Sequence, residues 1–183
     1  MRSVLLLLAL ALAACSASPS GAKPEAVTVA PGITLALPAP GELGHGVDAV
    51  QLVTARRGGD SFVFECRLSV DGERLLLVGS DSMGRRAMAV RWSKDGMTVE
   101  RADWLPDTLR PENILADIML LYWPEAAVRR GLSGAVLSQT SQGRSIGESI
   151  AISWQGDPWN GSSRLVNTPW GYEIEVRSAR LSP

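Results

Sequence analysis

The fold is decided by the stretch FVFECRLSVDGERLLLV, which spans residues 62–78. Apolar side chains occupy every second position from Phe62 to Val70, and a period of two is typical of a β-strand with one buried face. Asp71-Gly72 follows, a pair that favours a two-residue type I′ turn. The chain then returns through a second apolar run that ends at Val78. The stretch therefore predicts a β-hairpin.

A two-residue turn fixes which residues of this hairpin face one another. It places Leu68 opposite Leu75 and Cys66 opposite Leu77, all on the inner side of the sheet.

The pattern repeats in the next part of the chain, around Asp95-Gly96. A two-residue turn there places Trp92 opposite Val99 on the inner side. It also places Arg91 opposite Glu100 on the outer side, where the two can form an ion pair.

Late in the chain, the apolar residues Ile146, Ile150, Ile152 and Trp154 share one face of a predicted strand pair. Asn160-Gly161 predicts a further turn, and residues 172–176 alternate as a last strand. Turns between alternating runs indicate an antiparallel meander.

Between Leu105 and Leu132 the period changes to that of a helix. Ile114, Leu115, Ile118, Met119 and Tyr122 fall on one helical face, with Glu112, Asn113 and Asp117 off it. Pro111 suits the first turn and Pro124 ends the helix; a second short helix runs from Pro124 to Arg130. We expect an α+β fold, mainly β, with this helical pair covering the concave side of the sheet.

The N-terminus predicts a lipid anchor. One Arg precedes an apolar run that is too short to span a bilayer, and Leu12-Ala13-Ala14-Cys15 has the form of a lipoprotein cleavage site. We interpret residues 1–14 as a signal peptide, Cys15 as the lipidation site, residues 15–30 as a flexible tether, and residues 31–183 as one domain. Ser16 resembles the pattern of bacterial lipoproteins exported to the outer membrane.

Charge and cysteine content limit the classes of partner and the covalent bonds to be expected. The formal net charge of −1 argues against nucleic acid as a partner. With Cys15 lipidated, Cys66 is the one thiol left, so no internal disulfide is expected. We expect a monomer that contacts the membrane through its anchor.

Catalytic groups are scarce. His45 is the one histidine and lies in a glycine-rich stretch, so we expect a surface loop residue and no metal site. Cys66 lies on the apolar face of a strand, where a thiol behaves as a small hydrophobic side chain. Glu148 is either a rim residue, which we favour, or a buried polar anchor. We expect no cofactor and no enzymatic activity.

Two motifs carry a resemblance to a known family. Leu109-Arg110-Pro111-Glu112-Asn113-Ile114-Leu115-Ala116-Asp117 leads into Leu121-Tyr122-Trp123-Pro124, and Gly171-Tyr172 follows late in the chain. From about Ala49 onward, the chain resembles a family of uncharacterised Gram-negative lipoproteins found in aryl polyene gene clusters. That family is related to the LolA and LolB lipoprotein carriers. The resemblance implies a half-open, strongly curved antiparallel β-barrel whose hollow is closed by helices and accepts acyl chains.

The expected function is that of a lipid-anchored outer-membrane protein facing the periplasm. It would bind a lipid or acyl-like molecule, such as an aryl polyene, and help to deliver it to the outer membrane. The residues expected to form the cavity and its lid are Phe64, Leu75, Trp92, Ile114, Ile118, Met119, Tyr122, Ile150 and Ile152. The alternative is a non-enzymatic accessory or scaffold lipoprotein of an envelope complex, with its core filled by its own side chains.

Met83 is a candidate delivery residue. It lies in the longer, glycine-rich connection from Gly79 to Arg86, with Arg85 and Arg86 beside it. LolB-like carriers are similar in using a protruding apolar loop at this place in the meander. The alternative is an ordinary loop whose Met83 packs back on the rim of the barrel.

Overall fold

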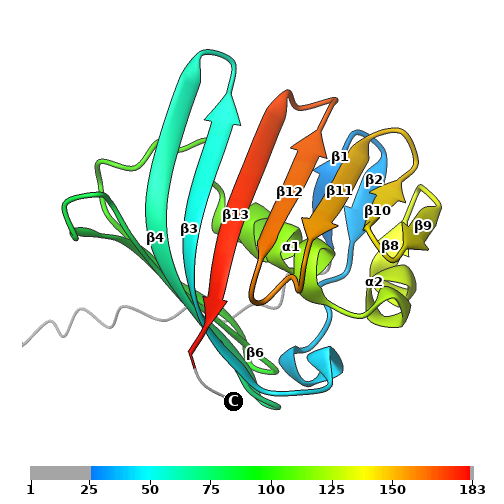
Figure 1. The fold of residues 1–183 in the computed structure, drawn as a ribbon, viewed down its shortest axis with the longest axis horizontal. Helices are drawn as coiled ribbons and strands as arrows, with labels where there is room; N and C mark the ends of the chain where they lie inside the picture. Colours follow the sequence, from blue (N-terminus) through cyan, green and yellow to red (C-terminus); the bar gives the residue numbers. More distant parts are fainter. Residues whose placement is uncertain (1–25, 182–183) are drawn as a thin grey trace, which may run out of the picture.

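A computed structural model describes residues 26–181, and its largest element is a ten-stranded antiparallel sheet. The strand order is β7-β6-β5-β4-β3-β13-β12-β11-β10-β9, and a small sheet with the order β1-β2-β8 lies beside it. Figure 1 shows the large sheet curving around helix α1. Within the described residues no pairing joins β7 to β9, so the sheet is not closed into a barrel. The prediction of a mainly β fold with two helices is confirmed.

The elements have the following bounds: β1 Val27–Ala30, β2 Ile33–Leu35, a 3₁₀ helix Pro40–Leu43, β3 Val47–Arg57, β4 Asp60–Val70, β5 Arg74–Ser80, β6 Arg86–Ser93, β7 Gly96–Arg101, α1 Pro111–Tyr122, α2 Glu125–Gly131, β8 Leu132–Ser133, β9 Leu137–Thr140, β10 Gly143–Ile146, β11 Ile150–Gln155, β12 Ser162–Asn167 and β13 Tyr172–Arg180.

The β4–β5 hairpin differs from its predicted register by two residues. Leu68 lies opposite Leu77 and Cys66 opposite Gly79, because the connection is longer than a two-residue turn. The Asp71 carboxylate accepts hydrogen bonds from two following backbone N–H groups, each at 2.9 Å, and so stabilises the longer turn. A shift of two residues leaves every side chain on its predicted face, since strands have a period of two.

The β6–β7 hairpin is also displaced from the predicted register. Its turn residues are Lys94 and Asp95 rather than Asp95 and Gly96, so Trp92 lies opposite Met97. Arg91 consequently lies opposite Thr98, and the predicted ion pair with Glu100 does not form.

Glu100 pairs instead with Arg86, at 3.2 Å. The predicted turn at Asn160-Gly161 also needs correction. The β11–β12 connection spans residues 156–161, so Asn160-Gly161 is not a two-residue turn.

The folded region begins earlier than residue 31. Val27–Ala30 form β1, which pairs with β2, so the last part of the predicted tether is a strand. Cys15 and the predicted signal peptide lie outside the described residues. Over the described part of the chain, no helix has both the length and the apolar character needed to cross a bilayer.

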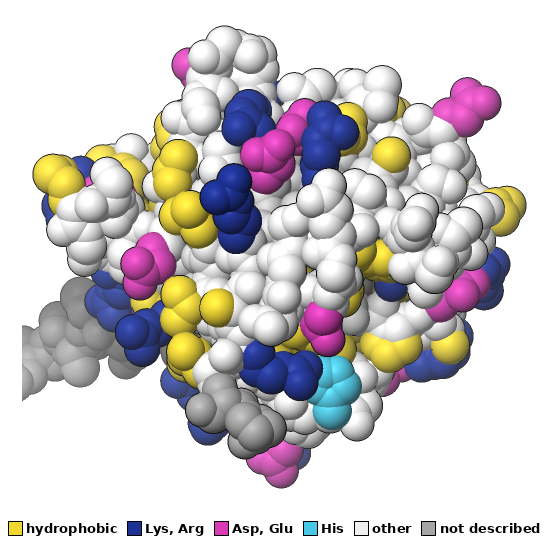
Figure 2. Space-filling model, in the orientation of Figure 1, with side chains coloured by type: hydrophobic (Ala, Val, Ile, Leu, Met, Phe, Trp, Pro, Cys, Tyr) yellow, Lys and Arg dark blue, Asp and Glu magenta, His cyan; other side chains and the backbone are white. Residues whose placement is uncertain are grey.

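Ion pairs cross the outer face of the sheet. The face seen in Figure 2 carries Arg and acidic side chains side by side. Glu173 on β13 pairs with Arg56 on β3 at 3.4 Å and with Arg164 on β12 at 2.6 Å. The outer face therefore suits contact with water.

Helix α1 is attached to the sheets at both ends. Near its start, Asn113 Nδ2 donates to Thr28 O at 2.8 Å. At its end, Trp154 Nε1 donates to Leu121 O at 3.2 Å, and Arg144 Nη2 donates to Trp123 O at 3.0 Å. A cation near the C-terminus of a helix is also favourable to the helix dipole. These bonds hold α1 across the concave face of the large sheet.

We expect the Trp154→Phe variant to lose about 1 kcal/mol of unfolding free energy, because it lacks the indole N–H that bonds to Leu121 O. Urea unfolding followed by circular dichroism measures this. The matched control is Trp104→Phe, since the Trp104 side chain is exposed. Its effect should stay within about 0.5 kcal/mol. Equal losses in the two variants would contradict the attachment of α1 through Trp154.

Candidate functional site

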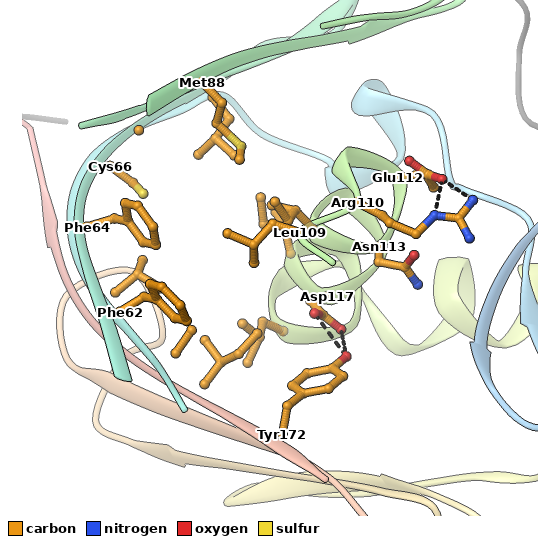
Figure 3. A pocket seen from close by; sticks show the side chains of 18 of the residues that line it. Phe62, Phe64, Cys66, Met88, Leu109, Arg110, Glu112, Asn113, Asp117 and Tyr172 are labelled. Carbon is orange, nitrogen blue, oxygen red and sulfur yellow. Dashed lines mark hydrogen bonds and ion pairs between the residues drawn. The ribbon is translucent and has the colours of Figure 1, made fainter. Parts of the chain in front are cut away.

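A cavity of about 830 Å³ lies between the concave face of the sheet and α1. Figure 3 shows Phe62, Phe64 and Cys66 on β4 facing Leu109 and the helix, with Met88 above them. The apolar residues of its wall are Ala26, Val27, Val53, Ala55, Phe62, Phe64, Cys66, Leu77, Ala87, Met88, Met97, Leu109, Ile114, Ile118, Leu121, Trp170, Ile174 and Val176. The chain thus surrounds a largely apolar space.

The cavity opens at one end of the strands. On β4 the inner face is buried at Cys66 and beyond, but Phe62 and Phe64 are only partly buried. On β13, Val176 is buried, whereas Ile174 and Tyr172 are partly exposed. The strands pair antiparallel through β3, so the more exposed ends of β4 and β13 lie at the same end of the cavity.

The closed end holds a self-contained polar cluster. Gln51 Nε2 donates to the Tyr122 hydroxyl at 2.9 Å and to the Ser178 hydroxyl at 3.0 Å. The two hydroxyls are 3.2 Å apart. Burial raises the pKa of Tyr122, so the phenol stays protonated. These groups satisfy one another's hydrogen bonds, so the closed end needs no further polar partner.

A second polar chain lies on the α1 side of the cavity. Tyr172 donates its hydroxyl hydrogen to the Asp117 carboxylate, with distances of 2.9 and 3.1 Å to the two oxygens (Figure 3). Asn167 Nδ2 lies 3.3 Å from the same hydroxyl and donates to Val29 O at 2.8 Å. Asp117 is only 7% exposed. Its burial raises its pKa to about 7, although the bond from Tyr172 lowers it.

Sequence reasoning missed Asp117. The helical pattern predicts Asp117 off the apolar face of the helix, yet the cavity face comprises Ile114, Asp117, Ile118 and Leu121, which follow the i, i+3, i+4, i+7 spacing. A signal was present: the positions three and four residues away carry Asn113, Ile114, Leu120 and Leu121, so no basic side chain on the helix can pair with this carboxylate.

The predicted cavity residues divide into two groups. Phe64, Ile114, Ile118 and Tyr122 line the cavity. Leu75, Trp92, Met119, Ile150 and Ile152 are buried in the core and do not line it. The indole of Trp92, for example, donates to Pro38 O and is covered by the chain before the 3₁₀ helix. Alternation identifies the inner face of a strand but not what covers it.

The other singled-out residues offer no catalytic arrangement. Cys66 is buried and its pKa is raised to about 12, mainly by burial, so the thiol is not nucleophilic near neutral pH. His45 is exposed outside the strands and helices, which confirms a loop residue. Glu148 is exposed, which excludes the alternative of a buried polar anchor. Among residues 26–181, no three His, Cys, Asp or Glu side chains gather as metal ligands would.

Met83 is exposed, with 70% of its surface accessible, and does not pack back on the sheet. Its loop is fixed by Asp81, whose carboxylate accepts hydrogen bonds from the backbone N–H groups of Met83 and Arg85, each at 2.9 Å. The Arg85 guanidinium lies 5.2 Å from the ring centroid of Trp104, which is also exposed. Two apolar side chains are thus presented to solvent around one arginine.

One family model matches the chain over residues 48–180; it is described as a protein of unknown function, DUF3261. This range takes in both helices and every cavity-lining residue except Ala26, Val27 and Thr28. No curated protein matches the chain.

We expect the stability of the protein to fall as the pH rises from about 4 to about 7, because the folded state holds the Asp117 proton more tightly than the unfolded state does. Asp117→Asn removes this dependence. Relative to the wild type, the variant should gain about 1–4 kcal/mol on going from about pH 5 to about pH 8.

Urea unfolding at the two pH values measures the difference. Asp103→Asn is the control, since Asp103 is exposed, and its pH dependence should match that of the wild type. A wild type and an Asp117→Asn variant with the same pH dependence would contradict the buried state of this carboxylate.

Proposed function

The chain belongs to the DUF3261 family, and we propose that it is a non-enzymatic carrier that holds a lipid or acyl-like molecule in the cavity beneath α1. The observation that carries this proposal is the apolar cavity itself. Its volume of about 830 Å³ lies within the ~300–1,000 Å³ typical of small-molecule sites. An alkyl chain entering it removes apolar surface from water on both sides, which is favourable.

The arrangement of polar groups supports an amphiphilic cargo. The Gln51–Tyr122–Ser178 cluster at the closed end satisfies its own hydrogen bonds and demands no polar partner. Other polar and charged lining residues, among them Arg57, Arg110 and Asn113, lie toward the open end or near the start of α1. A molecule with an apolar tail and a polar head would match this gradient.

The resemblance to aryl polyene cluster lipoproteins and to LolA and LolB supports a more specific proposal. In this proposal the open, curved sheet is a half-open barrel of the LolB type, and α1 forms its lid. The helical pair was expected to cover the cavity, but no residue of α2 lines it, and α2 packs against β2 of the small sheet instead. The cargo is then an acyl chain or an aryl polyene tail.

The location proposed for this carrier is the periplasmic face of the outer membrane. It rests on the N-terminal sequence, in which an apolar run is followed by Ala13-Ala14-Cys15-Ser16. Lipidation at Cys15 would anchor the chain, and the Ser-, Pro- and Gly-containing stretch after it would act as a tether. An anchored carrier receives and releases its cargo beside the membrane.

Ile118→Asp in the unlipidated Cys15→Ser chain tests carriage. The new carboxylate would lie in the cavity wall beside Asp117, and an unpaired buried charge there disfavours an alkyl chain. We expect uptake of a fluorescent fatty acid to fall at least ~10-fold, equivalent to about 1.4 kcal/mol.

A second variant, which adds no charge, distinguishes loss of binding from loss of folding. Ile114→Trp fills cavity space with an apolar ring, since Ile114 lines the cavity and is only half-buried, and should also reduce uptake. Val63→Trp is its control, because Val63 lies between Phe62 and Phe64 but faces outward and is exposed. Folded Ile118→Asp and Ile114→Trp proteins with undiminished uptake would refute carriage in this cavity and favour an accessory lipoprotein.

We propose further that the Met83 loop delivers the cargo. Met83 and Trp104 are exposed apolar side chains, and Trp suits the boundary between lipid and water. Met83→Glu in the Cys15→Ser chain should reduce binding to anionic liposomes and cargo transfer to them by several-fold, with cargo uptake unchanged. Val136→Glu is the control at an equally exposed apolar residue on another loop. Transfer that is equal in the two variants would exclude a delivery role for Met83.

A further inference from the structure

The arginines that line the cavity differ in whether an acidic side chain pairs with them. Three arginines line it: Arg56, Arg57 and Arg110. Arg56 pairs with Glu173 at 3.4 Å and with Glu175 at 3.1 Å. Arg110 Nε donates to Glu112 at 2.8 Å. Within residues 26–181, no hydrogen bond or ion pair to the Arg57 guanidinium occurs.

Arg57 lies at the open end of the cavity. It is the last residue of β3, and it follows Val53 and Ala55 along the inner face of that strand, at positions two residues apart. It lies opposite Tyr172 in the pairing of β3 with β13. Its positive charge lowers the pKa of Tyr172, against the larger effect of burial, so the two side chains share one environment. Arg57 itself is exposed to solvent.

We propose that the cavity takes a single-chain amphiphile with an anionic head group, and that Arg57 binds this head. The inference rests on the proposed function and adds the charge of the cargo to it. A guanidinium offers several N–H donors in a fixed plane, which suits the oxygens of a carboxylate or a phosphate.

The length of the cavity wall fits a head at this position. From Arg57 to Gln51 the inner face of β3 runs for six residues, which is ~20 Å at ~3.3 Å per residue. An acyl chain in one leaflet spans about half of the ~30 Å hydrocarbon core of a bilayer. If the head lies at Arg57, the wall along Ala55 and Val53 is therefore long enough to hold the whole tail before the polar cluster at Gln51.

Asp117 does not compete with the head group for Arg57. Its carboxylate accepts the Tyr172 hydroxyl, and no direct bond joins it to Arg57 within the described residues. The charged and titratable groups that line the cavity come from four places: Arg56 and Arg57 on β3, Cys66 on β4, Tyr172 on β13, and Arg110, Glu112, Asp117 and Tyr122 at or along α1. Of the cations among these, Arg57 is the one left to bind a ligand.

Calorimetric titration of the full-length Cys15→Ser chain tests the proposal. The probes share one chain length and differ in their head: tetradecanoate, tetradecyl phosphate, tetradecan-1-ol and tetradecyltrimethylammonium, each below its micelle concentration. We expect both anions to bind more tightly than the alcohol, and the cation to bind least. The carboxylate and the phosphate together identify which oxyanion the site prefers.

Two variants test whether Arg57 causes the preference for an anionic head group. Arg57→Gln should weaken tetradecanoate binding about 3- to 10-fold and leave tetradecan-1-ol binding unchanged. It should also remove the weakening of tetradecanoate binding by added salt, because a partly exposed ion pair is screened. Arg67→Gln is the matched control: Arg67 is exposed on the outer face of β4, away from the cavity, and this variant should bind all four probes like the wild type.

The outcomes separate this inference from the carrier function. If tetradecan-1-ol binds but Arg57→Gln and Arg67→Gln have the same affinity for tetradecanoate, the head-group site is refuted and carriage stands. If none of the four probes binds, both proposals fail.

Discussion

The attachment of α1 at its two ends is the constraint on which the rest of the structure depends. The helix crosses the concave face of a curved sheet. At its start, Asn113 donates a hydrogen bond to Thr28 O. At its end, Trp154 and Arg144 donate hydrogen bonds to Leu121 O and Trp123 O. Between these ends, the side chains of α1 do not fill the space above β3 and β4, and a cavity of about 830 Å³ remains. Helix position, rather than the packing of one residue, creates the candidate site.

A cavity of this size lowers the stability of the folded protein when no ligand fills it. Protein interiors are close-packed, and unfilled apolar space lowers stability. The buried Asp117 adds a second cost, since it has one hydroxyl donor and a pKa of about 7. Perturbed titratable groups beside a cavity are more frequent at functional sites than elsewhere. Both features support a functional role for the space beneath α1.

The sequence predicts the faces of the strands better than their register. Alternation places Leu68, Leu75 and Leu77 on the inner face, and all three are buried. The pairing of Leu68 is nevertheless displaced by two residues, because Asp71 stabilises a longer turn than its neighbour Gly72 suggests. Turn length depends on side-chain bonds that a dipeptide rule does not contain, whereas a displacement by two leaves the faces unchanged.

The candidate site is only partly predictable from sequence. Phe64 and Ile118 line the cavity as expected, but Trp92 and Ile152 have the same alternation and lie in the filled core. The difference arises from what covers each strand, which local periodicity does not encode. Asp117 was missed because a charged residue on a helix is normally solvated.

Native mass spectrometry of the unlipidated Cys15→Ser chain, purified without detergent from cells that make it, tests the central claim most directly. The account predicts a bound amphiphile that adds a discrete mass to the wild-type chain and is lost in Ile114→Trp, which fills the cavity. A bare protein mass for the wild type, or the same added mass in Ile114→Trp, would contradict carriage in the cavity beneath α1.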